Sequence, residues 1–245
     1  MFVQFDVSAY SRLYSAFNEY DHALVRTLRS ALDDVPKRMA DVACGLGFST
    51  EALLAGFPEA TIVGVDIGAN LIEQAIDRVG DPRVKFRSYR ENTEMLATIG
   101  EPVDLLFIKS AYHYFEHEVP IPAMKEILTE TGVVALVERT ERSARSYPLP
   151  EQISMAWGTF FSDHRARSRM GIAEEAPVHI ETLSRGIPVR VARDAYLEGV
   201  EGGQYFGSAW FRPEIMQAWV ESERKKSVVD YEVFEEFYIY LYRFV

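Results

Sequence analysis

The fold is indicated most clearly by two stretches, Asp41-Val-Ala-Cys-Gly-Leu-Gly-Phe-Ser-Thr50 and, further along the chain, Val63-Gly-Val-Asp66. Apolar residues from Met39 to Ala43 suit a buried strand, and a helical pattern begins at the end of the first stretch. Between them, Gly45 and Gly47 let the backbone turn tightly and approach a ligand closely, while the start of the helix presents unpaired N–H groups. The stretch therefore predicts a strand, a ligand-cradling turn and a helix.

A carboxylate follows the next predicted strand. The apolar run from Thr61 to Val65 ends in Asp66, which lies 19 positions after Gly47. In a doubly wound sheet this spacing puts the carboxylate at the tip of the neighbouring strand, where it accepts hydrogen bonds from both ribose hydroxyls. A nicotinamide cofactor would use the same pair of features, but a dinucleotide fingerprint has a third glycine where this chain has Thr50.

The run resembles the first motif of class I S-adenosylmethionine-dependent methyltransferases, in which an acidic residue, Gly-x-Gly and Ser or Thr follow the first strand. The resemblance covers roughly residues 36 to 138, with a weaker match at the C-terminus. It implies that the methionine part of S-adenosylmethionine lies along the turn, that Asp66 holds the ribose, and that S-adenosylhomocysteine is the product. The residues expected to bind this cofactor are Tyr14, Asp41, Cys44, Gly45, Gly47, Thr50, Asp66, Ile67, Asn92 and Lys109.

The assignment at the adenine end is open. Many relatives place an acidic or amide side chain after the third strand, where Glu91 and Asn92 stand here, but the usual Gly-Asp or Gly-Asn is absent. A plain loop is the alternative interpretation of this segment. Cys44, the single cysteine, excludes an internal disulfide and fits the turn as a small lining residue better than as a nucleophile.

Strand and helix patterns alternate through the first half of the chain, which indicates an α/β protein with a parallel sheet. We expect a Rossmann-like, seven-stranded, mostly parallel sheet with a C-terminal antiparallel strand pair and a lid insertion. The predicted helices are 8–33 (one or two helices), 69–79, 122–130 and 212–225. Thr131-Gly132 is expected to end the helix 122–130. The predicted strands after the first two are 83–88, 103–108, 133–137, 187–192 and two runs within 228–245.

The two C-terminal runs leave no room for a crossover helix, so they are expected to be antiparallel neighbours. Their aromatic residues are expected to be mostly core. We expect one domain over residues 1–245, in which 1–35 form an N-terminal helical cover and 140–211 form a lid over the substrate.

Catalytic candidates lie just after the predicted strands. His113 follows the fourth strand and has the ordinary imidazole pKa, near 6.5, that suits removal of a proton from a hydroxyl or amine. Contact with cofactor or substrate, without proton transfer, is an equal alternative for it. Glu138 would orient a substrate nucleophile or form an ion pair with Arg139 or with another arginine of the lid. His113 and His117 lack an evident third ligand, so no metal site is expected.

Substrate contacts are expected from the cover and the lid. Tyr10 and Tyr14 would fold over the cofactor or serve as ordinary interior aromatics. The lid holds an arginine-rich run, suited to a substrate carboxylate or phosphate or simply to a solvated face, and aromatic residues suited to a pocket. The residues expected to bind substrate are Tyr10, Tyr114, Trp157, Arg165, Arg169, Tyr205 and Trp210, with Phe160, Phe161, Arg167 and Phe206 beside them.

The composition of the chain indicates which classes of binding partner are unfavourable. The formal charge of −11 disfavours a nucleic-acid partner, although residues 139–193 hold nine Lys/Arg and six Asp/Glu, a local +3. No apolar run is long enough to span a bilayer, and the N-terminus has no signal pattern, so we expect a cytoplasmic protein without membrane contact. The aromatic N-terminal helix leaves a homodimer possible.

The sequence thus predicts a methyltransferase that acts on oxygen or nitrogen of a small molecule, such as an aromatic or carboxylate-bearing metabolite. Two alternatives are a divergent or non-catalytic S-adenosylmethionine-binding protein and, less favoured, an NAD(P)-dependent oxidoreductase. Because the sulfonium is already an activated methyl donor, such an enzyme needs chiefly to align the acceptor and exclude water.

Overall fold

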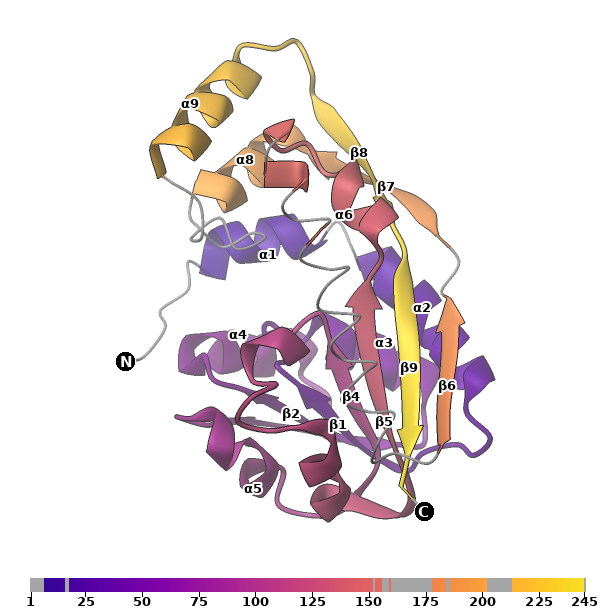
Figure 1. The fold of residues 1–245 in the computed structure, drawn as a ribbon. Coiled ribbons are helices and arrows are strands. Elements are labelled where there is room, and N and C mark those ends of the chain that lie inside the picture. Colours follow the sequence, from indigo (N-terminus) through magenta and orange to yellow (C-terminus); the bar gives the residue numbers. More distant parts are fainter. Residues whose placement is uncertain are drawn as a thin grey trace.

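The computed structural model describes residues 7–15, 18–151, 153–155, 159, 178–183, 186–201 and 213–244. A central seven-stranded sheet has the order β3-β2-β1-β4-β5-β9-β6 (Figure 1). Its strands are β1 (Arg38–Val42), β2 (Thr61–Asp66), β3 (Val84–Ser88), β4 (Val103–Lys109), β5 (Leu128–Arg139), β6 (Val178–Leu183) and β9 (Phe237–Arg243). The first five strands of that order are parallel, and β9 is antiparallel to both of its neighbours.

Helices alternate with these strands, as predicted. The first half contains α1 (Val7–Ser15), α2 (Asn18–Ala31), α3 (Phe48–Gly56), α4 (Ala69–Val79), α5 (Met95–Ile99) and the 3₁₀ turns η1 (Asn92–Glu94), η2 (Tyr112–Tyr114) and η3 (Ile121–Ile127). The second half contains α6 (Glu141–Ser146), α8 (Arg193–Glu201) and α9 (Pro213–Arg224), together with β7 (Ile187–Ala192) and β8 (Asp230–Glu235). The predicted strand 187–192 and helix 69–79 thus have the expected limits.

The central strand β4 shows why the sheet lies at the core. Successive side chains of a strand point to opposite faces, so both faces of a nearly continuous apolar strand need cover. Leu105 and Phe107 pack with residues of α2 and α3 on one face. Leu106 and Ile108 pack with residues of α5 and η3 on the other. This arrangement fixes the carboxyl ends of β1, β2, β4 and β5 along one edge of the sheet.

A second group of elements stands beyond that edge. α6, α8, α9 and the two-stranded sheet of β7 and β8 lie together above the carboxyl end of β5, and α1 lies between this group and α4 (Figure 1). Contacts of α1 with both α8 and α4 agree with that placement. The edge of the sheet, where ligands bind in such folds, is therefore covered by α1 and by this upper group.

The expected pairing of the two C-terminal strands is wrong. β8 pairs with β7, whereas β9 lies between β5 and β6 in the central sheet. Only Glu236 separates β8 from β9, and a hairpin needs at least two loop residues to reverse the chain. The antiparallel pair that ends the sheet is instead β9 with β6, a strand from the segment expected to be a lid.

The predicted helix 122–130 is also partly wrong. Residues 121–127 form the 3₁₀ turn η3, and β5 begins at Leu128. The register of β4 and β5 shifts between Val103 and Leu105, and a Cβ on Gly132 would lie 2.8 Å from the Val103 carbonyl oxygen. Gly132 therefore marks a close approach at a strand irregularity rather than the end of a helix.

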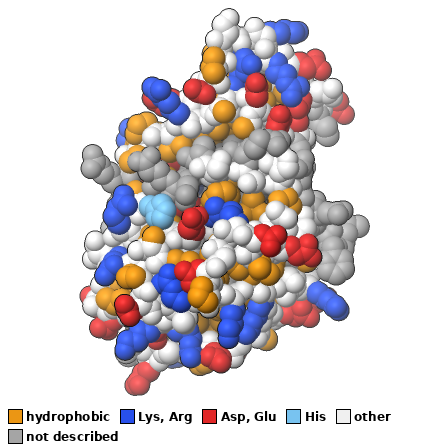
Figure 2. All heavy atoms as spheres, turned by 180° about the vertical axis from the view of Figure 1, so that it is seen from behind, with side chains coloured by type: hydrophobic (Ala, Val, Ile, Leu, Met, Phe, Trp, Pro, Cys, Tyr) orange, Lys and Arg blue, Asp and Glu red, His pale blue; other side chains and the backbone are white. Residues whose placement is uncertain are grey.

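Among the described residues, no helix combines the length and the apolar character that crossing a bilayer requires. On the face seen in Figure 2, acidic and basic side chains of the described residues are interspersed.

Candidate functional site

The turn between β1 and α3 has the strained geometry expected of a ligand cradle. Ala43, Gly45 and Gly47 all have positive φ, at 56°, 54° and 77°. A Cβ on Gly47 would also lie 3.0 Å from Val79 and 3.1 Å from Phe86, so close packing adds a second reason for glycine there. The turn is thereby held against α4 and β3.

Asp41 fixes the helix to the strand beneath this turn. Its Oδ2 accepts hydrogen bonds from Ser49 Oγ at 2.8 Å and from Thr50 Oγ1 at 2.6 Å. Burial raises the pKa of Asp41 to about 6, although the two hydroxyl donors and Lys109 act against that rise. Asp41 is 1% exposed and Thr50 is fully buried. Both residues therefore support the turn by joining α3 to β1 beneath it.

Asp66 is held by the backbone on both sides. Its Oδ2 accepts from the Gly45 N–H at 2.8 Å, and its Oδ1 accepts from the Gly68 N–H at 2.7 Å. Burial raises the pKa of Asp66, and these backbone bonds oppose the rise. Each carboxylate oxygen keeps a second lone pair, so a bound diol could still donate to both.

These groups border one cavity of about 490 Å³, a volume typical of small-molecule sites. Eight of the residues predicted to bind cofactor or substrate line it: Tyr14, Cys44, Gly45, Asp66, Ile67, Asn92, Lys109 and Tyr114. Burial raises the pKa of the Cys44 thiol well above its ordinary value, which agrees with a lining role and not with a nucleophile. Asn92 donates to the Tyr114 carbonyl oxygen at 3.3 Å, which ties the two loops together.

Other predicted residues do not reach the cavity. Among the described residues, Asp41, Gly47, Thr50, His113 and Glu138 are not part of its lining. His113 is half-buried, and its ring centroid lies 4.0 Å from that of Tyr114. Glu138 is 2% exposed in β5, and its neighbour Arg139 forms an ion pair with Glu235.

The lid residues lie outside the described part of the chain. This holds for Trp157, Phe160, Phe161, Arg165, Arg167, Arg169, Tyr205, Phe206 and Trp210, and also for the side chain of Tyr10, whose backbone belongs to α1. The described residues include no group of three or more His, Cys, Asp or Glu side chains placed to hold a metal ion.

Sequence reasoning missed many of the lining residues, among them the acidic partners of two ion pairs at one end of the cavity. The lining residues that it did not place there are Tyr20, Asp21, Ala43, Leu46, Phe48, Ser49, Leu71, Tyr89, Ser110, Ala111, Phe115, Arg139, Glu235 and Phe237. Lys109 forms an ion pair with Asp21, and Arg139 pairs with Glu235 at 3.3 Å. Acidic residues inside otherwise apolar patterns, as at Asp21 and Glu235, are the sequence signal that could have found this end.

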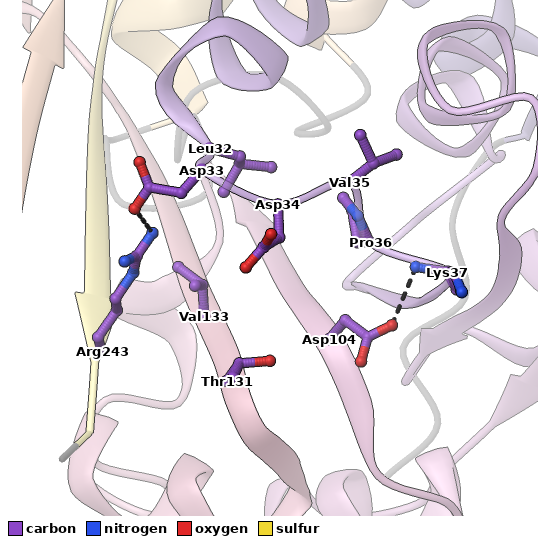
Figure 3. A pocket seen from close by; sticks show the side chains of 10 residues that line it. All are labelled: Leu32, Asp33, Asp34, Val35, Pro36, Lys37, Asp104, Thr131, Val133 and Arg243. Atoms are coloured by element: carbon purple, nitrogen blue, oxygen red, sulfur yellow. Dashed lines mark hydrogen bonds and ion pairs between the residues drawn. The ribbon is translucent and has the colours of Figure 1, made fainter.

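A second cavity, of about 300 Å³, lies at the opposite end of the sheet. There Asp33 pairs with Arg243, and the Lys37 backbone N–H donates to Asp104 at 2.9 Å (Figure 3). These interactions join the carboxyl end of β9 and the amino end of β4 to the α2–β1 connection. No residue of the glycine-rich motif lines this cavity, so we regard it as structural.

Comparisons with known proteins agree with the geometry. Residues 39–132 match the family model described as a methyltransferase domain. The malonyl-[acyl-carrier protein] O-methyltransferase of Acetivibrio thermocellus is 29% identical over 83% of this chain and 68% of that protein. The trans-aconitate 2-methyltransferase of Afipia carboxidovorans is 26% identical over 56% of this chain, which spans only about half, 53%, of that relative.

Solved structures show the same fold. The plantazolicin methyltransferase BpumL, in complex with a pentazolic desmethylPZN analog and SAH, aligns with a TM-score of 0.55 over 95% of this chain and 86% of that chain, at 12% identity. Sheet order, motif position and the family model thus lead to one assignment. The fold of the chain is that of the class I S-adenosylmethionine-dependent methyltransferases, and residues 39–132 match the model of a methyltransferase domain.

Proposed function

We propose that this protein transfers a methyl group from S-adenosylmethionine to an oxygen or nitrogen atom of a small molecule. One observation carries the proposal: the glycine-rich turn, Asp66 and the loops after β3 and β4 line a single cavity at the carboxyl edge of the sheet. The family match and the methyltransferase relatives support it.

The cavity residues fit the adenosyl group. Asp66, fixed by two backbone N–H donors, would accept the ribose hydroxyls. Gly45 and Cys44 would lie along the methionine part, and Ile67 and Asn92 beside the adenine. Bound there, the cofactor supplies an activated methyl group.

Several motif residues would then act by position rather than by contact. Asp41 and Thr50 hold α3 against β1, and Gly47 packs the turn against α4. Since neither His113 nor Glu138 lines the cavity, we assign neither of them proton transfer.

The remaining parts of the chain would enclose the acceptor. We propose that residues 1–35 cover the cavity, with Tyr14 of α1 on its lining, and that residues 140–211 bring further substrate contacts over it. Water would be excluded as these segments close over the acceptor, which favours transfer to the intended nucleophile. A cytoplasmic location and a homodimer through the N-terminal helix also stay predictions, which fractionation and light scattering would test.

The experiment is a transfer assay with S-adenosylmethionine and a panel of phenols, alcohols, amines and carboxylic acids. We expect S-adenosylhomocysteine and one methylated product to form in equal amounts, measured by mass spectrometry. If S-adenosylhomocysteine binds but no acceptor is methylated, the protein is a non-catalytic binder of the cofactor. If it binds NADH and neither adenosyl compound, the oxidoreductase alternative replaces the proposal.

A further inference from the structure

Two buried ion pairs stand at one end of the cavity. Lys109 of β4 pairs with Asp21 of α2, and their side chains are 17% and 3% exposed. Arg139 of β5 pairs with Glu235 of β8, with side chains 10% and 1% exposed. All four residues line the same cavity as the glycine-rich turn. Buried charges of this kind need a reason, because removing them from water is costly even when they are paired.

The strand order places these pairs away from the ribose site. Asp66 ends β2, and the sheet then continues through β1 and β4 to β5, which ends in Arg139. Three strand spacings of about 4.8 Å separate the two ends by roughly 14 Å. The turn after β1, where the methionine part is proposed to lie, stands between them. The Arg139–Glu235 pair is therefore at the acceptor end of the cavity.

Glu235 is fixed there by two neighbours. The Tyr147 hydroxyl donates to its Oε1, and the Arg139 guanidinium lies 3.3 Å from its Oε2. Arg139 is itself positioned by aromatic rings, 4.7 Å from the ring centroid of Tyr147 and 5.3 Å from that of Phe237. Each Glu235 oxygen retains a lone pair beyond these contacts. A carboxylate so held can accept one more proton donor from the cavity.

We propose that Glu235 takes the proton from the methyl acceptor, and that this acceptor is a neutral hydroxyl or amine rather than a carboxylate. This inference rests on the function proposed above and names the acceptor class and the catalytic residue of that site. As the acceptor oxygen or nitrogen bonds to the methyl carbon, the carbon–sulfur bond breaks and its electron pair stays on sulfur. The acceptor proton passes to Glu235, which releases it to water once the product leaves.

The charge of the lining favours a neutral acceptor. Its described basic groups, Lys109 and Arg139, are each matched by a carboxylate, and Asp66 adds a further negative charge. Among the described lining residues no basic side chain is left over to bind an anionic acceptor, so only the sulfonium of the bound cofactor would balance its charge. A hydroxyl or amine adds no charge but must lose a proton on methylation, and Glu235 supplies the group that accepts it.

Titration of Glu235 fits this role. Burial raises its pKa to about 7, whereas Arg139 and Lys109 lower it and Asp21 raises it. The groups that face it are Arg139 of β5, Lys109 of β4, Asp21 of α2 and Tyr147, which follows α6. A general base is most effective when its pKa lies near the working pH.

The first test compares Glu235→Gln with wild type on the acceptor that gives most S-adenosylhomocysteine, with phenol, benzylamine and benzoate as a ring-matched set. We expect kcat to fall by at least about 100-fold with KM little changed, and the rise of rate with pH near 7 to disappear. Glu223→Gln is the matched control, because Glu223 is also buried, accepts from Tyr231 at 2.9 Å and pairs with Lys226, but does not line the cavity.

An unchanged kcat in Glu235→Gln, or turnover of benzoate in preference to phenol and benzylamine, would overturn the inference while leaving the methyltransferase function in place. Failure of wild type to methylate any acceptor would count against the function itself.

A second measurement follows the titration of the Glu235 carboxyl group directly. It needs no methyl acceptor and no variant that removes the charge of Glu235. Glutamate side chains are labelled with ¹³C at the carboxyl carbon, and the Glu235 signal is identified by its loss in Glu235→Asp, which keeps the charge. We expect this signal to titrate near pH 7, and at higher pH in Tyr147→Phe, where the ionised carboxylate loses a donor. A signal that stays fully ionised from about pH 5 to 8 would overturn the role of Glu235.

Discussion

Asp41 illustrates how a residue can serve a site that it does not touch. Its carboxylate is buried and accepts hydrogen bonds from two hydroxyls of α3. These bonds fix the start of α3 against β1 and so hold the turn between them in place. The sequence identified Asp41 by its place in a motif. An aspartate at that place is expected both when it contacts the ligand and when it only supports the turn. Only the position of the side chain beneath the backbone separates the two roles.

This position makes the stability of the protein depend on pH. In the folded protein the pKa of Asp41 is about 6, against 3.8 for an ordinary aspartate, so the folded state binds the proton more tightly. The resulting stabilisation is full below pH 4 and is lost as pH rises to about 6, by up to about 3 kcal/mol. In Asp41→Asn the amide oxygen still accepts from both hydroxyls, and this part of the pH dependence should vanish.

Urea unfolding of wild type and Asp41→Asn from pH 4 to 7 checks the prediction. Asp41→Ala is the contrasting variant, because it leaves two buried hydroxyls without their acceptor and should lose about 2 to 4 kcal/mol. Equal slopes of stability against pH in wild type and Asp41→Asn would show that Asp41 is not the titrating group.

The apolar patterns of the sequence located most strands and helices, but they did not show which strands pair with each other. The runs at 61–65 and 103–108 predicted β2 and β4 because both faces of these strands are covered. The partners of β8 and β9 could not be read in this way, since β7 and β6 are distant in sequence. The run between them, Glu235-Glu-Phe237, does lack turn residues, and that signal argued against a hairpin.

A comparison of two glycines at helix ends distinguishes the cost of backbone strain from the cost of close packing. Gly80, which ends α4, and Gly47, which precedes α3, both have positive φ. A Cβ on Gly80 would meet nothing within 4 Å, whereas one on Gly47 would press on Val79 and Phe86. We expect Gly80→Ala to lose about 1 kcal/mol and Gly47→Ala about 2 to 4 kcal/mol.

Urea unfolding of the two alanine variants measures these costs. Gly47→Ala should also weaken binding of S-adenosylhomocysteine, because it displaces the turn that carries Gly45, and Gly80→Ala should not. Equal losses of stability would mean that the close packing of Gly47 contributes nothing.

For the molecule as a whole, the site is a product of two sets of elements. The central sheet supplies the glycine-rich turn and Asp66, and α2 and β8 supply Asp21 and Glu235 at the other end. The sequence predicted the first set because its residues are close together along the chain. It did not place the second, whose residues lie far apart along the chain and meet only in the folded protein, where β9 lies between β5 and β6.

The two sheets should differ in local stability. β4 and β5 are central in seven strands and covered on both faces, whereas β7 and β8 form a sheet of two strands. We expect amide hydrogens of β7 and β8 to exchange at least about tenfold faster than those of β4 and β5. Hydrogen–deuterium exchange followed by mass spectrometry measures this, and equal protection of both sheets would show that they unfold as one unit.

The proposed function requires that this cavity bind an adenosyl cofactor through Asp66, and calorimetric titration of S-adenosylhomocysteine measures that binding. We predict binding by wild type, about 10- to 100-fold weaker binding by Asp66→Asn through loss of charged hydrogen bonds, and unchanged binding by Asp81→Asn, whose aspartate pairs with Arg83 outside the cavity. NADH should not compete. Equal affinity in wild type and Asp66→Asn would show that Asp66 does not hold the ribose, and no binding of S-adenosylhomocysteine at all would show that the cavity is not a site for the adenosyl cofactor.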